Sequence, residues 1–194
     1  MNQDNATARE KLFKAAVELV SEGKTEKQIT TREIARRAGI NLALVNYYYQ
    51  SKENLLGQVV GTMMGDIIAR LSHYHNAVTD SRSRLLNMLL VTADAAFEYH
   101  SICSIAISAE LKSGCINSCA LVMPLLKEIL PGFNETDLKI IALQLMVPFH
   151  HIVLTPEIYS VYLNTDFFDK EKRGEKIEQM VDCALSGQAR EEKL

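Results

Sequence analysis

Residues 30–52, TTREIARRAGINLALVNYYYQSK, constrain the fold more than any other stretch of the sequence. Thr30 followed three residues later by Glu33 is a capping box, which predicts the start of a helix. Gly39 can end that helix in the left-handed conformation, and Asn41 can cap the next one. Two helices of about two turns, joined by a short turn containing glycine, predict a helix-turn-helix. The second helix of this motif enters the major groove of DNA.

The rest of the sequence predicts helices and no strands. An apolar stripe of helical period follows Thr7, which is expected to cap the first helix. No clear alternation of β-branched and polar residues is found, and 47% of the residues are apolar. We therefore expect an all-α protein, with a three-helix head in residues 1–52 and a larger helical domain in residues 53–194. Residues 157–168 are expected to be irregular.

Charge and targeting signals narrow the partners. Residues 1–52 hold nine Lys and Arg against six Asp and Glu, whereas the whole chain has a net charge of −3. A basic head on an acidic body suits a polyanion-binding domain. No signal peptide is recognised, and no uninterrupted apolar run approaches the roughly 20 residues that span a bilayer. The sequence predicts a cytoplasmic protein without a membrane partner.

The stretch TTREIARRAGINLALVNYYYQSKENLL resembles the N-terminal domain of the TetR family of bacterial transcriptional regulators. The resemblance lies in a Thr-led helix, an I-A-x-x-A-G turn, a short aromatic helix and an S-K-E-x-L-L start to a long helix. It implies a DNA-binding head on a helical body that dimerises and binds a small-molecule effector. Carried over to this sequence, it implies that five residues contact operator DNA: Thr31, Ala43, Asn46, Tyr47 and Lys52.

The chemistry of these residues agrees with such a role. A hydroxyl at a helix N-terminus, a phenol and a lysine are phosphate partners, and Asn46 can hydrogen-bond an adenine edge. Two departures from the family pattern stand out, because Asn46 replaces a common tyrosine and Leu44 replaces a polar residue. Leu44 is expected to pack inward rather than to face the groove, since exposed leucine on so short a helix is unfavourable.

The body is expected to hold the effector pocket and the dimer interface that the resemblance implies. The predicted pocket residues are flexible or aromatic, which suits an apolar ligand, although core packing explains each one taken alone better. They are Met63, Met64, Met88, Phe97, Tyr99 and Met123. The predicted dimer interface is an apolar stripe on each of the last two long helices. It comprises Leu138, Ile141, Leu145, Ile177, Met180, Val181, Ala184 and Leu185.

Three glycines, Gly57, Gly61 and Gly65, recur at four-residue spacing on the expected fourth helix. Each should cost about 0.8–1 kcal/mol relative to alanine in a helix interior. Close approach of another helix is the favoured explanation, and a soft joint between head and body is the alternative.

The sequence does not favour catalysis or metal binding. It has no glycine-rich phosphate loop and no nucleophile motif. Cys115 and Cys119 lack a histidine or carboxylate at ligand spacing, so packed, reduced thiols are preferred over a redox or zinc site. We expect a non-enzymatic, homodimeric repressor without cofactor or metal, which binds palindromic operator DNA and is released by a small molecule. The alternative is a helical ligand-binding or adaptor protein whose head does not bind specific DNA. The operator, the effector and the regulated genes do not follow from the sequence.

Overall fold

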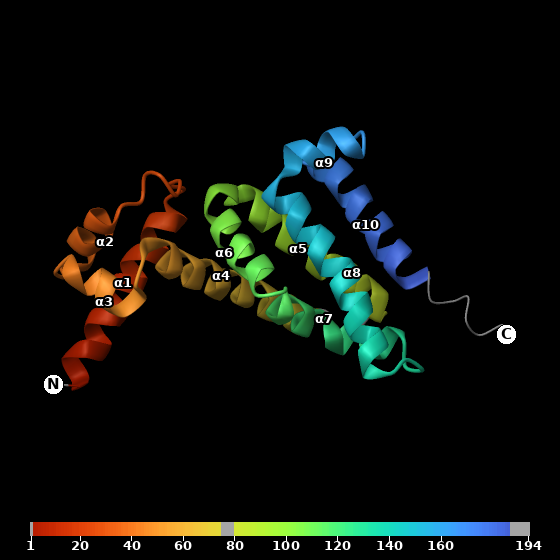
Figure 1. Ribbon diagram of the computed structural model, residues 1–194, viewed down its shortest axis with the longest axis horizontal. Coiled ribbons are helices and arrows are strands. Elements are labelled where there is room, and N and C mark those ends of the chain that lie inside the picture. Colours follow the sequence, from red (N-terminus) through yellow and green to blue (C-terminus); the bar gives the residue numbers. More distant parts are fainter. Residues whose placement is uncertain (1, 75–79, 187–194) are drawn as a thin grey trace. The chain divides into compact units, whose positions relative to one another are not determined.

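The structure is a computed structural model that describes residues 2–74 and 80–186, with side chains for residues 8–66 and 80–186. All regular elements in the described residues are helices, which confirms the predicted all-α class (Figure 1). They are α1 (Asn2–Ser21), α2 (Thr31–Ala38), α3 (Ala43–Tyr49), α4 (Lys52–Tyr74), α5 (Ser81–Glu98), α6 (His100–Lys112), α7 (Ile116–Ile129), α8 (Glu135–Leu154), α9 (Pro156–Tyr162) and α10 (Lys170–Ser186).

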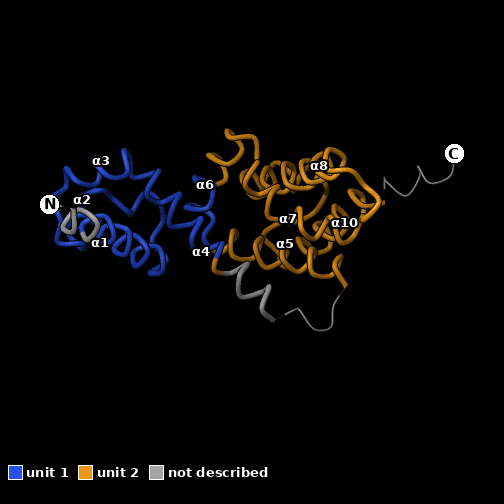
Figure 2. Tube along the Cα trace, turned by 90° about the horizontal axis from the view of Figure 1, so that it is seen from below, with its two compact units in different colours: residues 1–65, 99–106 blue, residues 66–98, 107–194 orange. Residues whose placement is uncertain are grey.

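The chain packs as two units, shown in different colours in Figure 2. Unit 1 comprises Met1–Gly65 and Tyr99–Ala106, and unit 2 comprises Asp66–Glu98 and Ile107–Leu194. Both α4 and α6 therefore contribute residues to each unit. The boundary predicted at residue 52 separates functions, whereas these units are separated by their packing. The predicted boundary therefore stays a prediction.

Helices α1, α2 and α3 form the predicted three-helix head in unit 1, in which α1 packs against both α2 and α3. The apolar stripe of α1 is buried, with Leu12 and Leu19 fully shielded from solvent. Gly23 and Gly39, at φ +74° and +65°, end α1 and α2 in the left-handed conformation. Glycine adopts this conformation without the steric penalty of a Cβ atom. These turns bring α2 and α3 back onto one core.

Unit 2 is built around α5, α7, α8 and α10. Helix α7 packs on α5 and α8, and α10 also packs on both of these helices. Leu89 of α5, Leu126 of α7 and Ile141 of α8 are at most 1% exposed. Asn134 caps α8 by accepting hydrogen bonds from the backbone N–H groups of Thr136 and Asp137 at 2.9 and 3.0 Å. The core of unit 2 is thus a helical bundle.

Two expectations about element boundaries are wrong. Helix α1 begins at Asn2 and not at Thr7, whose side chain lies outside the described residues. The stretch after residue 156 is not wholly irregular, because it opens with α9, where Pro156 sits in the first helical turn with its fixed φ angle already suited to a helix.

Helix α8 is strongly apolar, although the sequence has no uninterrupted apolar run of the length that spans a bilayer. Helix α8 is long and apolar enough to cross a membrane. Helices α6 and α7 taken together are also long and apolar enough, but they are bent by 85° relative to each other. Half of the α8 segment is buried inside the protein. The core helix of a soluble protein can be equally long and apolar, so the length and composition of α8 are weak evidence for a membrane span.

Candidate nucleic-acid interface

The inner side of α3 is fixed to α1. Val45 is fully buried and Tyr49 is 3% exposed. The Tyr49 hydroxyl donates a 2.9 Å hydrogen bond to the backbone carbonyl of Arg9, whose guanidinium carbon lies 5.6 Å from the centre of the Tyr49 ring. Burial raises the pKa of the Tyr49 phenol, which keeps it a hydrogen-bond donor. Helix α3 therefore has one defined side toward the core.

The opposite side of α3 faces solvent. Ala43, Asn46 and Tyr47 are all exposed, and their spacing of three and four residues places them on one helical face. Tyr47 is 72% exposed, and its ring meets that of Tyr48 edge to face, with centroids 5.0 Å apart. Three of the five predicted DNA contacts are thus brought together. Leu44 is partly exposed, so the expected inward packing of its side chain is incomplete.

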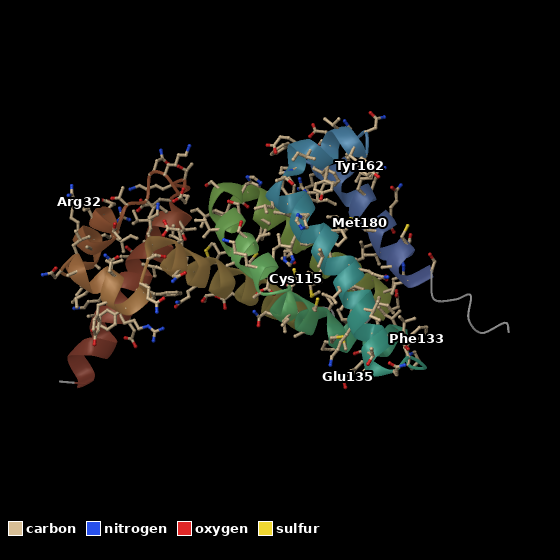
Figure 3. All side chains as sticks on the ribbon, in the orientation of Figure 1. Arg32, Cys115, Phe133, Glu135, Tyr162 and Met180 are labelled. Carbon is tan, nitrogen blue, oxygen red and sulfur yellow. The ribbon has the colours of Figure 1, made fainter. Side chains whose placement is uncertain are left out.

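The start of α2 offers a second polar surface. The Thr30 side chain caps the helix by accepting a 3.1 Å hydrogen bond from the backbone N–H of Glu33. Thr31, a predicted DNA contact, is the first helical residue and is partly exposed. Arg32 beside it is exposed and extends outward from α2 (Figure 3). The sequence interpretation passed over Arg32, although an arginine in the first turn of the helix was visible there.

Most other cations around α2 are held by carboxylates of the same unit. Arg36 donates two hydrogen bonds to Glu33, at 3.0 and 2.8 Å, and Arg37 binds Glu22. The bonds from Arg36 lower the pKa of the Glu33 carboxyl to about 2. By contrast, Arg32 has no ion pair or hydrogen bond within the part of the chain whose side chains are described. A guanidinium in this position is available to a phosphate.

Lys52, the fifth predicted DNA contact, has a partner inside unit 1. Its ammonium group donates a 3.0 Å hydrogen bond to the backbone carbonyl of Glu26 and also binds the Glu26 carboxylate. Its side chain is only 18% exposed. Lys52 is therefore less accessible than the residues on α2 and α3, and its contact with DNA stays a prediction.

The six predicted pocket residues are divided between the two units. Met63, Met64 and Tyr99 belong to unit 1, whereas Met88, Phe97 and Met123 belong to unit 2. All six are partly exposed. Their role as an effector pocket stays a prediction.

Phe97 takes part in a packed cluster of unit 2. Its ring lies 4.5 Å from the guanidinium carbon of Arg173 and meets the ring of Phe168 edge to face at 5.7 Å. Arg173 is 5% exposed and donates a 2.6 Å hydrogen bond to Asp94 and a 2.8 Å bond to the carbonyl of Phe167. These contacts tie α10 to α5, so Phe97 has a structural role that the sequence did not indicate.

A buried hydrogen-bond chain joins α6, α7 and α8 in unit 2. Ser118 donates its hydroxyl and backbone N–H to Glu110, at 3.0 and 2.8 Å. His150, 7% exposed, lies with Nε2 3.3 Å from the Ser118 hydroxyl and Nδ1 3.6 Å from the Cys115 sulfur. The two ring nitrogens of His150 thus face a hydroxyl and a thiol.

Burial lowers the pKa of His150, and burial raises that of the Cys115 thiol. Cys103, Cys115 and Cys119 are buried and Cys183 is exposed, all as free thiols. No group of three metal-ligating side chains occurs among the residues described, and the predicted absence of a metal stays a prediction. The sequence could not show that His150 meets Cys115, since 35 residues separate them.

Residues 12–59 match the family model described as bacterial regulatory proteins, tetR family. This segment contains α2, α3 and the start of α4, which hold every DNA contact predicted above. These residues form a TetR-family N-terminal domain. The search of curated proteins found no match to the chain.

Solved structures of transcriptional regulators, two of them described as TetR regulators, share the fold of more than nine-tenths of the chain. The Thermus thermophilus FadR repressor in complex with lauroyl-CoA has 17% identity and a TM-score of 0.73, with 93% of this chain and 94% of that one covered. A TetR regulator from Rhodococcus sp. RHA1 has 13% identity and a TM-score of 0.63, at 95% and 99% coverage. Bacillus subtilis FadR in complex with stearoyl-CoA has 14% identity and a TM-score of 0.59, at 91% and 97% coverage. The chain is therefore a TetR-like fold with a TetR-family domain at its N-terminus.

The predicted dimer interface of this TetR-like fold stays a prediction, and the protomer itself already buries much of it. Most of its apolar residues are at most 3% exposed within one subunit, where they form the core between α8 and α10. These are Leu138, Ile141, Leu145, Ile177 and Val181, while Met180, Ala184 and Leu185 are partly exposed. The exposed apolar residues of α8 are instead Ile140 and Leu143, at 47% and 43%. Strict helical periodicity identified the face of α8 that packs within the protomer.

Proposed function

We propose that this protein is a DNA-binding transcriptional regulator, a repressor that binds palindromic operator DNA as a homodimer in the cytoplasm. The observation that carries the proposal is the exposed face of α3, which presents Asn46 and Tyr47 on a helix anchored by Tyr49. An exposed tyrosine on a short, well-anchored helix that follows a glycine turn suits a recognition helix. The TetR-family match over residues 12–59 supports the same function.

In this proposal α3 enters the major groove. Asn46 can form two hydrogen bonds with an adenine edge, and Ala43 can contact a thymine methyl group. Thr31, Arg32 and Tyr47 bind phosphates on either side and set the register of the helix. Operator preference would then rest mainly on Asn46.

The uncovered side of α8 supports a homodimer. An α-helix that is apolar on all sides is normally buried on all sides, yet only half of α8 is buried within the protomer. Ile140 and Leu143 lie on its exposed part. A second copy packed on this face by two-fold symmetry would cover both residues in each protomer and present two heads to two half-sites.

The proposed effector is an apolar small molecule that binds the helical body. Among the three fold relatives described, two are complexes with acyl-CoA. Met88 and Met123 are partly exposed in unit 2 and offer adaptable apolar contacts. Acyl-CoAs are therefore the first compounds to screen.

Retention of genomic DNA fragments by the purified protein tests the function. A regulator should retain specific fragments, with affinity that falls steeply as salt rises. Tyr47→Ala should lose this binding, while Lys112→Ala, in the exposed last turn of α6, serves as the matched surface control. Failure to retain any fragment would favour the helical adaptor protein.

Release of a retained fragment tests the effector. Lauroyl-CoA and stearoyl-CoA are added to the complex, with free coenzyme A as the control for the head group. An acyl-chain effector should release DNA and raise the melting temperature of the protein, because a ligand that binds only the folded state stabilises it. Equal effects of the acyl compounds and of coenzyme A would exclude recognition of the acyl chain.

A further inference from the structure

The segment between α1 and α2, residues 22–30, carries two carboxylates that bind cations of two different helices in unit 1. Glu22 binds Arg37 in the last turn of α2. Glu26 binds Lys52, the first residue of α4. One short segment therefore holds the end of α2 and the beginning of α4.

The contact at α4 is more than an exposed ion pair. Lys52 binds both the carboxylate of Glu26 and its backbone carbonyl, the latter at 3.0 Å. Two of the three ammonium protons are thus directed to one residue, and the side chain is 18% exposed. A bond to the backbone fixes the path of the segment as well as the side chain. A phosphate could take over Lys52 only by displacing this pairing.

The contact at α2 is reinforced by neighbouring charges. Arg37, 24% exposed, also lies 4.0 Å from Glu33, and Lys24 lies 3.7 Å from both Glu22 and Glu33. Several mutually paired charges hold a geometry better than a single surface pair, which is usually worth little. The end of α2 is therefore held by a network.

Helix α3 lies in the chain between these two held points. Helix α2 ends at Ala38, α4 begins at Lys52, and α3 occupies residues 43–49. The interior side of α3 is anchored separately through Tyr49 and Arg9. Fixing both flanks limits how α3 can tilt or slide on α1.

We propose that residues 22–30 act as a clasp that positions α3 for DNA, and that Lys52 is a positioning residue in this clasp with Glu26 as its partner. The proposal rests on the proposed DNA-binding function. It assigns the phosphate contact beside α2 to the unpaired Arg32 and not to Lys52. It also predicts that Glu26, an acidic residue, favours DNA binding.

Salt dependence distinguishes positioning from phosphate contact. Each phosphate contact to B-DNA contributes about 0.9 to the slope of log affinity against log salt. Losing a contact lowers the magnitude of the slope, whereas misplacing the helix weakens binding without removing a specific counterion-release step. The side chains to compare are Lys52, Glu26 and Arg32.

The experiment measures binding of the full chain to a genomic fragment retained by the wild type, over a range of salt, well below the melting temperature. Lys52→Met and Glu26→Gln are each expected to weaken binding by about tenfold with an unchanged slope. Arg32→Gln is expected to lower the slope by about 0.9. Glu10→Gln, in the exposed part of α1, controls for the general effect of removing a carboxylate.

The opposite pattern would overturn the clasp. If Lys52 contacts a phosphate and Glu26 merely competes for it, Lys52→Met lowers the slope by about 0.9. Glu26→Gln then strengthens binding beyond the effect of Glu10→Gln. The two models thus differ in the direction of the Glu26→Gln effect.

Thermal unfolding separates failure of the clasp from failure of the proposed function. If Lys52 and Glu26 act as one pair, the double variant Lys52→Met with Glu26→Gln loses no more melting temperature than the more damaging single variant. Additive losses would overturn the clasp even in a protein that binds DNA. If the wild-type protein retains no DNA fragment, the proposed function is overturned instead. The thermal unfolding data would still show whether Lys52 and Glu26 act as a pair.

Discussion

Tyr47 and Tyr49 lie two residues apart on α3 and face opposite environments, the first 72% exposed and the second 3% exposed. Tyr49 donates a hydrogen bond to the carbonyl of Arg9 and belongs to the core. Tyr47 contacts Tyr48 and otherwise faces solvent. One short helix thus carries a tyrosine that stabilises the fold and another that is available to a partner.

Substitutions at these two tyrosines should have separate effects. Tyr49→Phe removes one buried hydrogen bond and should cost about 1 kcal/mol of unfolding free energy, while Tyr49→Ala should cost about 3 kcal/mol or more. Tyr47→Ala should change stability by less than about 0.5 kcal/mol, as an exposed substitution does, yet abolish specific DNA binding. Denaturant unfolding and a binding titration check the pair. A large loss of stability in Tyr47→Ala would contradict this division.

Replacing a glycine by alanine should lower stability at a left-handed helix end and raise stability inside a helix. Gly39 has a φ of +65°, so Gly39→Ala should cost about 1 kcal/mol, even though no described atom beyond its chain neighbours lies within 4 Å of the new Cβ. Gly61 lies inside α4, also with nothing within 4 Å, so Gly61→Ala should stabilise the protein by about 0.5–1 kcal/mol. Thermal unfolding of both variants tests the two signs.

The open space around the glycines also tests why Gly57, Gly61 and Gly65 recur on α4. The sequence interpretation favoured close packing of another helix on Gly57, Gly61 and Gly65. A Cβ at any of the three would meet no described atom within 4 Å, so this packing is not found within the described residues. If the row instead softens α4, the triple alanine variant should still bind DNA but respond less to the effector. Unaltered release of DNA by the effector would contradict a role in coupling.

Local signals in the sequence predicted the head well because each acts over a few residues. Thr30 caps α2, Gly39 reverses the chain, and Asn41 accepts a 2.9 Å hydrogen bond from the backbone N–H of Ala43 at the start of α3. Hydrogen bonds between near neighbours depend little on the rest of the fold, so their residues can be recognised in the sequence.

Contacts between distant segments could not be predicted in the same way. The apolar stripe around Ile177 indicates a buried face but not whether the same protomer or a second one buries it. Lys52 is a suitable phosphate ligand by type, but the sequence does not show that Glu26 reaches it. His150 and Cys115 meet only because α7 packs against α8. Such pairings depend on tertiary packing.

Because His150 is buried, we expect the protein to lose stability in mild acid. Burial lowers its pKa below the ordinary value of 6.5, although Glu110 opposes this shift. The unfolded chain therefore binds a proton at His150 at a higher pH than the folded chain does. Its contribution to stability is present above pH about 6.5 and is lost as the pH falls toward the lower pKa of the folded protein.

Melting temperatures measured between pH 7.5 and 5 check this prediction. His150→Gln should lower stability at pH 7.5 by breaking the chain to Ser118 and Cys115, and should flatten the dependence on pH below 6.5. His151→Gln, at the partly exposed neighbouring position, is the matched control. Equal pH dependence in the wild type and His150→Gln would show that another group controls acid sensitivity.

The uncovered row on α8 predicts the assembly state and links it to DNA binding. Leu143 is 43% exposed in the protomer, so Leu143→Glu should leave the fold intact and place a charge in the proposed interface. The protomer of 21.8 kDa should then sediment alone, whereas the wild type should sediment at twice this mass. Because a palindrome engages two heads at once, affinity for operator DNA should fall by at least about 100-fold. Lys112→Glu, exposed in the last turn of α6, is the control and should remain dimeric. A dimeric Leu143→Glu variant would place the interface elsewhere.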